Sequence, residues 1–210
     1  MSSQINILDL YSKNFTGVNM SEKVEKNFQK IMQSFLDLLK SEPYDALSIE
    51  KIAKKSGMTR VNFYKYFTDK EDLLWRTFLY VFIEVEEEVS KIHPTTLLSN
   101  GKPLTYYAFE HLKKHRYFYK NIFENNLPYS FVEKLLNYFT EQSFRTHEVL
   151  RMQYKGKIPY LKINTYLSGA LFNLMRNLVM QEEDWDSLEI SEFFTKLAID
   201  GLQKTILDSR

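Results

Sequence analysis

Apolar residues at helical spacing are the feature that most constrains how this chain can fold. From Glu22 onward they recur at steps of three and four residues, with Lys and Glu between them: Val24, Phe28, Ile31, Phe35, Leu38 and Leu39. Only 6 Gly and 5 Pro occur in 210 residues, so little interrupts such patterns. No alternation of apolar and polar residues is long enough to predict a strand. The sequence therefore predicts an all-α fold.

Composition and charge exclude several classes of protein. Lys and Arg total 28 against 27 Asp and Glu, which excludes a basic protein that coats nucleic acid unselectively. The absence of Cys excludes disulfide frameworks, Cys-based zinc sites and thiol nucleophiles. The N-terminus lacks signal-peptide features, and the longest apolar run, 78–83, is too short to cross a bilayer. We therefore expect a cytoplasmic protein without membrane contact.

The positive charge is concentrated near the N-terminus. Residues 21–70 hold ten Lys and Arg against seven Asp and Glu, whereas residues 71–210 hold seventeen against nineteen. Within residues 48–67, Glu50 is the one acidic residue among five cations: Lys51, Lys54, Lys55, Arg60 and Lys65.

This basic segment predicts two short helices around a glycine turn. Ser48 is placed to cap a helix over 49–56, which Gly57 would end in a left-handed conformation. Thr59 is placed to cap a second helix over 60–66. These are the proportions of a helix-turn-helix, whose second helix enters a DNA major groove. Spacing and charge alone also allow a simple packing unit with a solvated basic face.

Further helices are expected along the rest of the chain. Asp69 is placed to cap a long helix that runs to about Ser90, with Asp72 as an approximate capping box. Beyond it the periodicity predicts helices over 103–115, 117–125, 128–153, 159–182 and 190–208.

The residues from Tyr44 to Leu74 read YDALSIEKIAKKSGMTRVNFYKYFTDKEDLL. Residues 31–74 resemble the N-terminal DNA-binding domain of TetR-family transcriptional regulators. The shared features are a Ser/Thr entry, Ile-Ala, a Gly turn, Tyr-x-(His/Tyr)-Phe and Lys-Glu-x-Leu-Leu. Val61 departs from the small residue, often Gly, that is common at its position in the family, which leaves the operator sequence open.

The resemblance implies a role for each matching residue. Contacts to the DNA backbone are implied for Ser48, Thr59, Tyr64, Tyr66 and Lys70. Base readout is implied for Arg60, Val61 and Asn62, and their chemistry fits, since Arg can fork onto guanine and Asn onto adenine. Lys65 joins this set as a group that binds phosphate.

The resemblance also implies the domain organisation. We expect an N-terminal arm over 1–20, a three-helix helix-turn-helix DNA-binding domain over 21–67, and a larger helical ligand-binding and dimerisation domain over 68–210. The helix over about 69–90 would connect the two domains. The implied function is a sequence-specific regulator, a homodimeric repressor that a small-molecule effector releases from double-stranded operator DNA. Two alternatives stay open: an activator or co-regulator whose C-terminal domain binds a protein partner, and a helical carrier or enzyme whose helix-turn-helix only packs.

The C-terminal helices are compatible with dimerisation and ligand binding. The helix over 159–182 is apolar on more than one stripe and must be covered on two sides. The pattern alone also allows a central helix buried within one subunit; the resemblance to TetR-family regulators implies that this helix and the helix over 190–208 form the dimer interface. The candidate effector-binding residues are Tyr106, Phe109, Phe123, Phe139, Tyr166, Phe172, Asn173, Met175 and Arg176. For any one of them ordinary core packing is the alternative, and Arg176 could equally pair with a Glu of the helix over 128–153.

No catalytic motif, cofactor site or metal site is expected. His111 and His115 lie four residues apart on a predicted helix, a spacing that allows joint metal binding. Two ligands are too few, however, and the neighbouring Lys113, Lys114 and Arg116 oppose a cation. We therefore expect a solvated basic helix face there.

Overall fold

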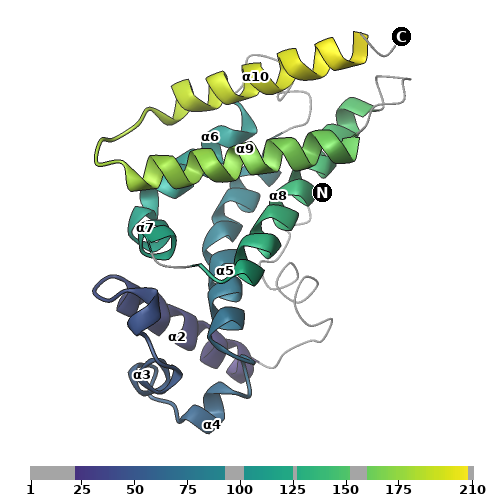
Figure 1. Ribbon diagram of the computed structural model, residues 1–210. Helices are drawn as coiled ribbons and strands as arrows, with labels where there is room; N and C mark the ends of the chain where they lie inside the picture. The colour runs from purple at the N-terminus through teal and green to yellow at the C-terminus, as the bar shows by residue number, and fades with distance from the viewer. Residues whose placement is uncertain (1–21, 93–101, 125–126, 152–159, 208–210) are drawn as a thin grey trace. The chain divides into compact units, whose positions relative to one another are not determined.

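The computed structural model describes residues 22–92, 102–124, 127–151 and 160–207 (Figure 1). The predicted all-α fold is confirmed, because all regular elements in these ranges are helical. They are α2 (Glu22–Leu39), the 3₁₀ helix η1 (Tyr44–Ala46), α3 (Ile49–Lys55), α4 (Arg60–Phe63), α5 (Lys70–Ser90), α6 (Leu104–Lys114), α7 (Arg116–Glu124), α8 (Tyr129–Arg151), α9 (Tyr160–Met180) and α10 (Ser187–Leu207). None of the helices in the described ranges is both long and apolar enough to cross a bilayer.

Two compact units divide the chain, and the division falls inside α5. The first unit ends at Ile83 and the second begins at Glu84. From the sequence we expected the domain boundary at 67/68, ahead of α5. The division in the structure lies within α5, and this helix therefore supplies residues to both units. The expected arm over 1–20 lies outside the described residues.

Aromatic residues form the centre of the N-terminal unit. Phe28 of α2 stacks on Phe67 with ring centroids 4.6 Å apart, and Phe67 lies 5.5 Å from Phe63. All three side chains are buried. Phe63 and Phe67 therefore anchor the second short helix to this core.

The helix start and stop signals act where they were predicted. The Ser48 hydroxyl accepts a hydrogen bond from the Lys51 N–H at 3.2 Å, and the Thr59 hydroxyl accepts one from the Asn62 N–H at 3.2 Å. Gly57 adopts φ +68°, the left-handed conformation that ends α3.

The second short helix is tighter than expected. Regular α-helix covers Arg60–Phe63 and then passes into a turn, in place of a helix over 60–66. The N–H of Lys65 bonds the carbonyl of Asn62 and that of Tyr66 bonds the carbonyl of Phe63, both at 3₁₀ spacing. This tightening carries Phe67 back onto the core.

One element was not predicted. The 3₁₀ helix η1 follows Pro43 and buries Tyr44 beside Phe35, with ring centroids 6.3 Å apart.

In the C-terminal unit α9 is the central helix. It packs against α8, α7 and α6, while α10 packs against α6. Buried residues of this core include Phe109, Leu112, Phe118, Tyr119, Leu135, Met175 and Val179.

Replacing Gly57 by Ala tests the turn between α3 and α4. A side chain at φ +68° is strained, so we expect the free energy of unfolding to fall by about 1–2 kcal/mol. The added Cβ would meet only the flexible end of Lys30 at 3.4 Å, so the cost is conformational. Urea unfolding measures it. Lys55→Ala, at an exposed helical position nearby, is the matched control, and an equal loss in both variants would contradict this account.

Candidate nucleic-acid interface

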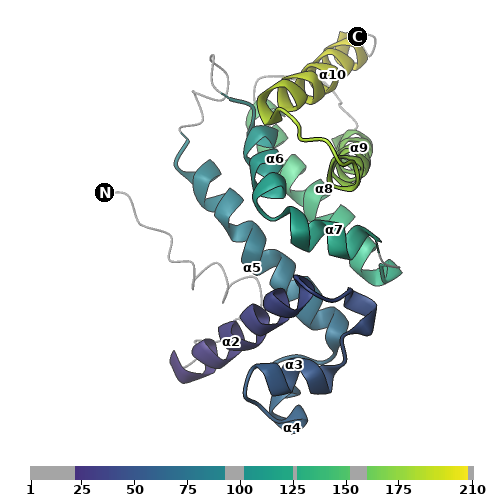
Figure 2. The same ribbon diagram turned by 90° about the vertical axis from the view of Figure 1, so that its left-hand side faces the viewer.

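Four side chains form the outward surface of α4 and of the turn that follows it. Arg60, Val61, Tyr64 and Lys65 are exposed, and Val61 keeps 73% of its surface accessible. Phe63, on the opposite side, is fully buried. Figures 1 and 2 show α4 directly after α3, against which it packs. We call these four residues the α4 face; it offers two cations, one hydroxyl and one apolar side chain.

Arg60 and Tyr64 support each other on this face. The Arg60 guanidinium donates a hydrogen bond to the Tyr64 hydroxyl at 3.3 Å and lies 5.7 Å from the ring centroid. The hydrogen bond raises the pKa of Arg60 above its ordinary value, so the side chain stays cationic. A stacked guanidinium has fewer conformations to lose when it binds.

Tyr66 and Lys70 make bonds inside the N-terminal unit. The Tyr66 hydroxyl accepts a hydrogen bond from the Asn27 side chain at 2.9 Å. The Lys70 ammonium donates to the Tyr44 carbonyl at 3.1 Å and lies 4.2 Å from the Tyr44 ring centroid. Burial lowers the pKa of Lys70. Both residues therefore brace the unit, and the Tyr66 hydroxyl keeps its own proton for a further acceptor.

Ser48, Thr59 and Asn62 complete the predicted DNA-binding set. Ser48 and Thr59 are exposed, and each caps the short helix that follows it. Asn62 is half-buried beside the α4 face. The structure thus brings the predicted residues of α4 to one surface, while Tyr66 and Lys70 lie partly inside.

A glycine turn between two short helices, an exposed basic second helix and a supporting third helix define a helix-turn-helix DNA-binding domain. Residues 31–76 match the family model described as "Bacterial regulatory proteins, tetR family". The match covers the N-terminal unit's helix-turn-helix and identifies it as a TetR-family DNA-binding domain, as the sequence resemblance predicted. No curated protein matches the chain.

Solved structures share the fold over most of the chain. The structure of NalD, the secondary repressor of the MexAB-OprM multidrug efflux pump in Pseudomonas aeruginosa, has a TM-score of 0.62 and 17% identity, covering 85% of this chain and 98% of that one. FadR of Thermus thermophilus, a TetR-family repressor in complex with lauroyl-CoA, has a TM-score of 0.59 and 16% identity, covering 83% and 94%. The dihydroxyacetone kinase operon activator DhaS has a TM-score of 0.60 and 17% identity, covering 84% and 96%.

The candidate effector-binding residues are spread over the C-terminal unit. Phe109, Phe123, Phe139 and Met175 are buried, and Phe172 is half-buried with its ring centroid 5.7 Å from that of Phe123. Tyr166, Asn173 and Arg176 lie on the exposed side of α9. Among the described residues the structure therefore does not gather these side chains around one cavity.

Tyr106 lies apart from that group, at a surface pocket of about 560 Å³. The Lys102 ammonium stands 3.8 Å from the Tyr106 ring centroid, and Lys113 on the same wall pairs with Asp184 at 2.8 Å. Trp185 lines the pocket from the segment before α10.

The solvated basic face expected around His111 is wrong for that residue. His111 is buried, and its Nε2 lies 3.0 Å from the Tyr119 hydroxyl. Burial, together with His115 nearby, lowers the pKa of His111 to about 3, so the imidazole is neutral at pH 7. Glu84 of α5 lies beside both histidines, a convergence that local sequence patterns do not reveal.

Thr59→Ala tests the cap of α4. Losing the hydroxyl leaves the Asn62 N–H without its acceptor, so we expect the free energy of unfolding to fall by about 1 kcal/mol. Thr68→Ala is the matched control, because that hydroxyl only donates to exposed Asp69 next to it and its loss should cost less than about 0.5 kcal/mol. Chemical unfolding of both variants gives the comparison, and equal stabilities would contradict the capping role.

Proposed function

We propose that the protein is a homodimeric repressor whose two α4 faces bind successive major grooves of a near-palindromic operator, and that a small-molecule effector releases it. The α4 face is the observation that carries the proposal: its cations and its apolar Val61 project outward from a rigid aromatic core. The family match over residues 31–76 supports DNA binding and regulation; that the chain is no enzyme remains a prediction.

The side chains of the α4 face fit two kinds of DNA contact, one to base edges and one to phosphates. Arg60 has the fork that reads guanine, and Val61 offers methyl groups that can meet a thymine methyl. Tyr64 and Lys65 provide the hydroxyl and ammonium that bind phosphate. Ser48 and Thr59 stand exposed at the two helix starts, at positions where the family contacts the DNA backbone. We therefore assign base readout to Arg60, Val61 and half-buried Asn62.

Exposed apolar side chains on α9 and α10 support the dimer. Tyr166 of α9 keeps 74% of its surface accessible, and Phe193 and Leu197 of α10 keep 64% and 59%. Phe193 and Leu197 are four residues apart and so share one face of α10. Large apolar groups on two helices call for a partner surface. A second copy of the chain fits best, because a helix-turn-helix reader uses two half-sites one helical turn or its multiple apart.

We propose that the effector binds in the aromatic interior of the C-terminal unit. Phe109, Phe123 and Met175 provide an apolar environment, and lauroyl-CoA in the FadR structure is an example of a ligand carried by the same fold. A coupling free energy of about 1–3 kcal/mol between effector and DNA suffices to change DNA affinity 5- to 150-fold.

Activation is the second candidate, because DhaS, an activator by its description, shares the fold to the same degree as the repressors. The position of the operator relative to the promoter decides the sign of regulation. In this reading the C-terminal domain would bind a protein partner in place of a small ligand.

The double substitution Tyr64→Ala/Lys65→Ala tests DNA binding. We expect weaker binding to every DNA sequence, and a plot of log affinity against log salt whose slope is smaller by about 1, because one phosphate contact by a cation is lost. Fluorescence anisotropy with DNA from upstream of the protein's own coding sequence measures both. Lys40→Ala removes an exposed cation at the end of α2, paired with Asp37, and serves as control. Unchanged binding by the double variant would refute the proposed docking.

The double substitution Phe193→Glu/Leu197→Glu tests the dimer. Two carboxylates would have to be buried without partners, so we expect the wild-type dimer to become a monomer in sedimentation velocity. Tyr129→Glu, on α8 with 81% of its surface accessible, changes an equally exposed aromatic outside the proposed interface and should leave the dimer intact. A wild-type monomer, or a dimer in the double variant, would rule out this interface.

A further inference from the structure

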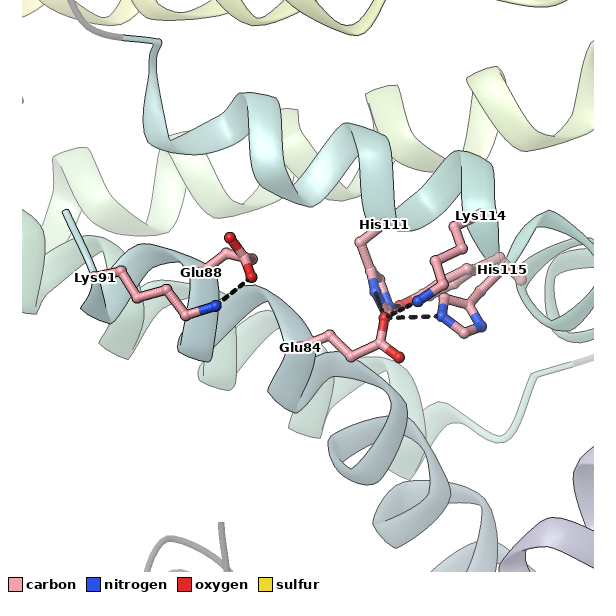
Figure 3. A network of polar contacts seen from close by, with 7 residues as sticks. Glu84, Glu88, Lys91, His111, Lys114 and His115 are labelled. Carbon is pink, nitrogen blue, oxygen red and sulfur yellow. Dashed lines mark hydrogen bonds and ion pairs between the residues drawn. The ribbon is translucent and has the colours of Figure 1, made fainter. Parts of the chain in front are cut away.

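Three side chains of the C-terminal unit converge on one point. Glu84 lies at the start of that unit on α5, and His111 and His115 lie four residues apart on α6. Figure 3 shows both imidazoles turned toward the Glu84 carboxylate. One oxygen of Glu84 is 3.2 Å from Nε2 of His115 and 3.7 Å from Nδ1 of His111.

These distances are close to those around a bound metal ion. Ligands at about 2.0–2.1 Å in tetrahedral geometry stand about 3.4 Å apart. The three donor atoms all lie within 4.8 Å of one another, so small side-chain rotations bring them to that spacing. Spacing of i and i+4 on a helix places two imidazoles on one face, as in helical zinc-binding motifs.

The surroundings of His111 orient its ring for such a role. The ring is buried, and the Tyr119 hydroxyl lies 3.0 Å from Nε2. When Nε2–H donates to this hydroxyl, the lone pair of Nδ1 faces Glu84 and His115. Metal-binding histidines are oriented in the same way by a hydrogen bond from the second ring nitrogen.

Lys114 holds the position that a cation would take. Its ammonium donates to the same Glu84 oxygen at 2.8 Å. The Lys114 side chain is exposed, so it can leave toward solvent when a stronger cation arrives. Further along the chain from Glu84, Glu88 pairs with Lys91 and not with the histidines (Figure 3).

We propose that Glu84, His111 and His115 form a binding site for a divalent transition-metal ion of the zinc type. Two imidazoles and one carboxylate suit zinc and its neighbours, whereas Mg²⁺ and Ca²⁺ prefer ligand sets of oxygen alone. With three protein ligands the fourth position would be left to water or to another small donor. From the sequence we expected no metal site, because two histidines are too few ligands. Glu84, from another helix, supplies the third ligand. It stands independently of DNA binding.

Zinc titration of the tag-free full-length protein, stripped with EDTA, tests the site. We expect one Zn²⁺ per protomer in calorimetry with Glu84, His111 and His115 intact, and a rise in Tm on zinc addition. Glu84→Gln keeps the shape of a half-buried side chain and His115→Ala removes a half-buried imidazole, and each should weaken binding at least about 10- to 100-fold. Circular dichroism in EDTA verifies that both variants are folded.

Lys114 and Lys113 provide a matched pair of controls. Lys114→Ala removes the competing ammonium, so zinc should bind about two- to fivefold more tightly. Lys113→Ala removes a cation that pairs with Asp184, away from the cluster, and should leave zinc affinity unchanged. Wild-type protein that binds no zinc, or a zinc affinity in Glu84→Gln and His115→Ala equal to that of the wild type, would overturn the proposal.

Discussion

The burial of Phe63 and Phe67 is the constraint on which the DNA-binding surface depends. Isolated helices as short as α4 are not stable in water, so α4 exists because tertiary contacts hold it. Phe67 stacks on Phe28 of α2, and Arg76 of α5 places its guanidinium 5.6 Å from the Phe28 ring centroid. Arg76 is held in turn by Asp72 at 2.7 Å. Residues from α2, α4 and α5 thereby fix one short helix.

The composition of the α4 face follows from that anchoring. At about 3.6 residues per turn, positions 61 and 65 lie opposite the buried positions 63 and 67. Arg60, at the start of α4, and Tyr64, just after its end, are exposed at the flanks. The exposed Val61 has no packing role, since its methyl groups face solvent in the N-terminal unit. An exposed β-branched residue between two cations is therefore better explained by an intermolecular contact than by stability.

How far sequence could predict the structure depends on the range of the interactions involved. Ser48, Gly57 and Thr59 act through neighbours within a few residues, so their roles as caps and turn were predictable. The 3₁₀ helix η1 was missed because its stability comes from burying Tyr44 against Phe35 rather than from a local cap. The candidate effector residues were chosen by composition, and composition does not distinguish buried Phe109 from exposed Tyr166. The meeting of Glu84 with His111 joins segments far apart in sequence, which no local pattern encodes.

The contact between Glu84 and α6 lies on α5, the helix that supplies residues to both units. Glu84 follows Ile83, the last residue of the N-terminal unit, on one uninterrupted helix. At present Lys114 and His115 hold the Glu84 carboxylate; although partial burial raises its pKa, their hydrogen bonds bring it below the ordinary value. An exposed ion pair of this kind contributes about 0–1 kcal/mol. A coordinated cation would hold the same oxygen and two imidazoles together more strongly, so exchanging ammonium for metal changes how firmly α5 is tied to α6 without any new backbone contact.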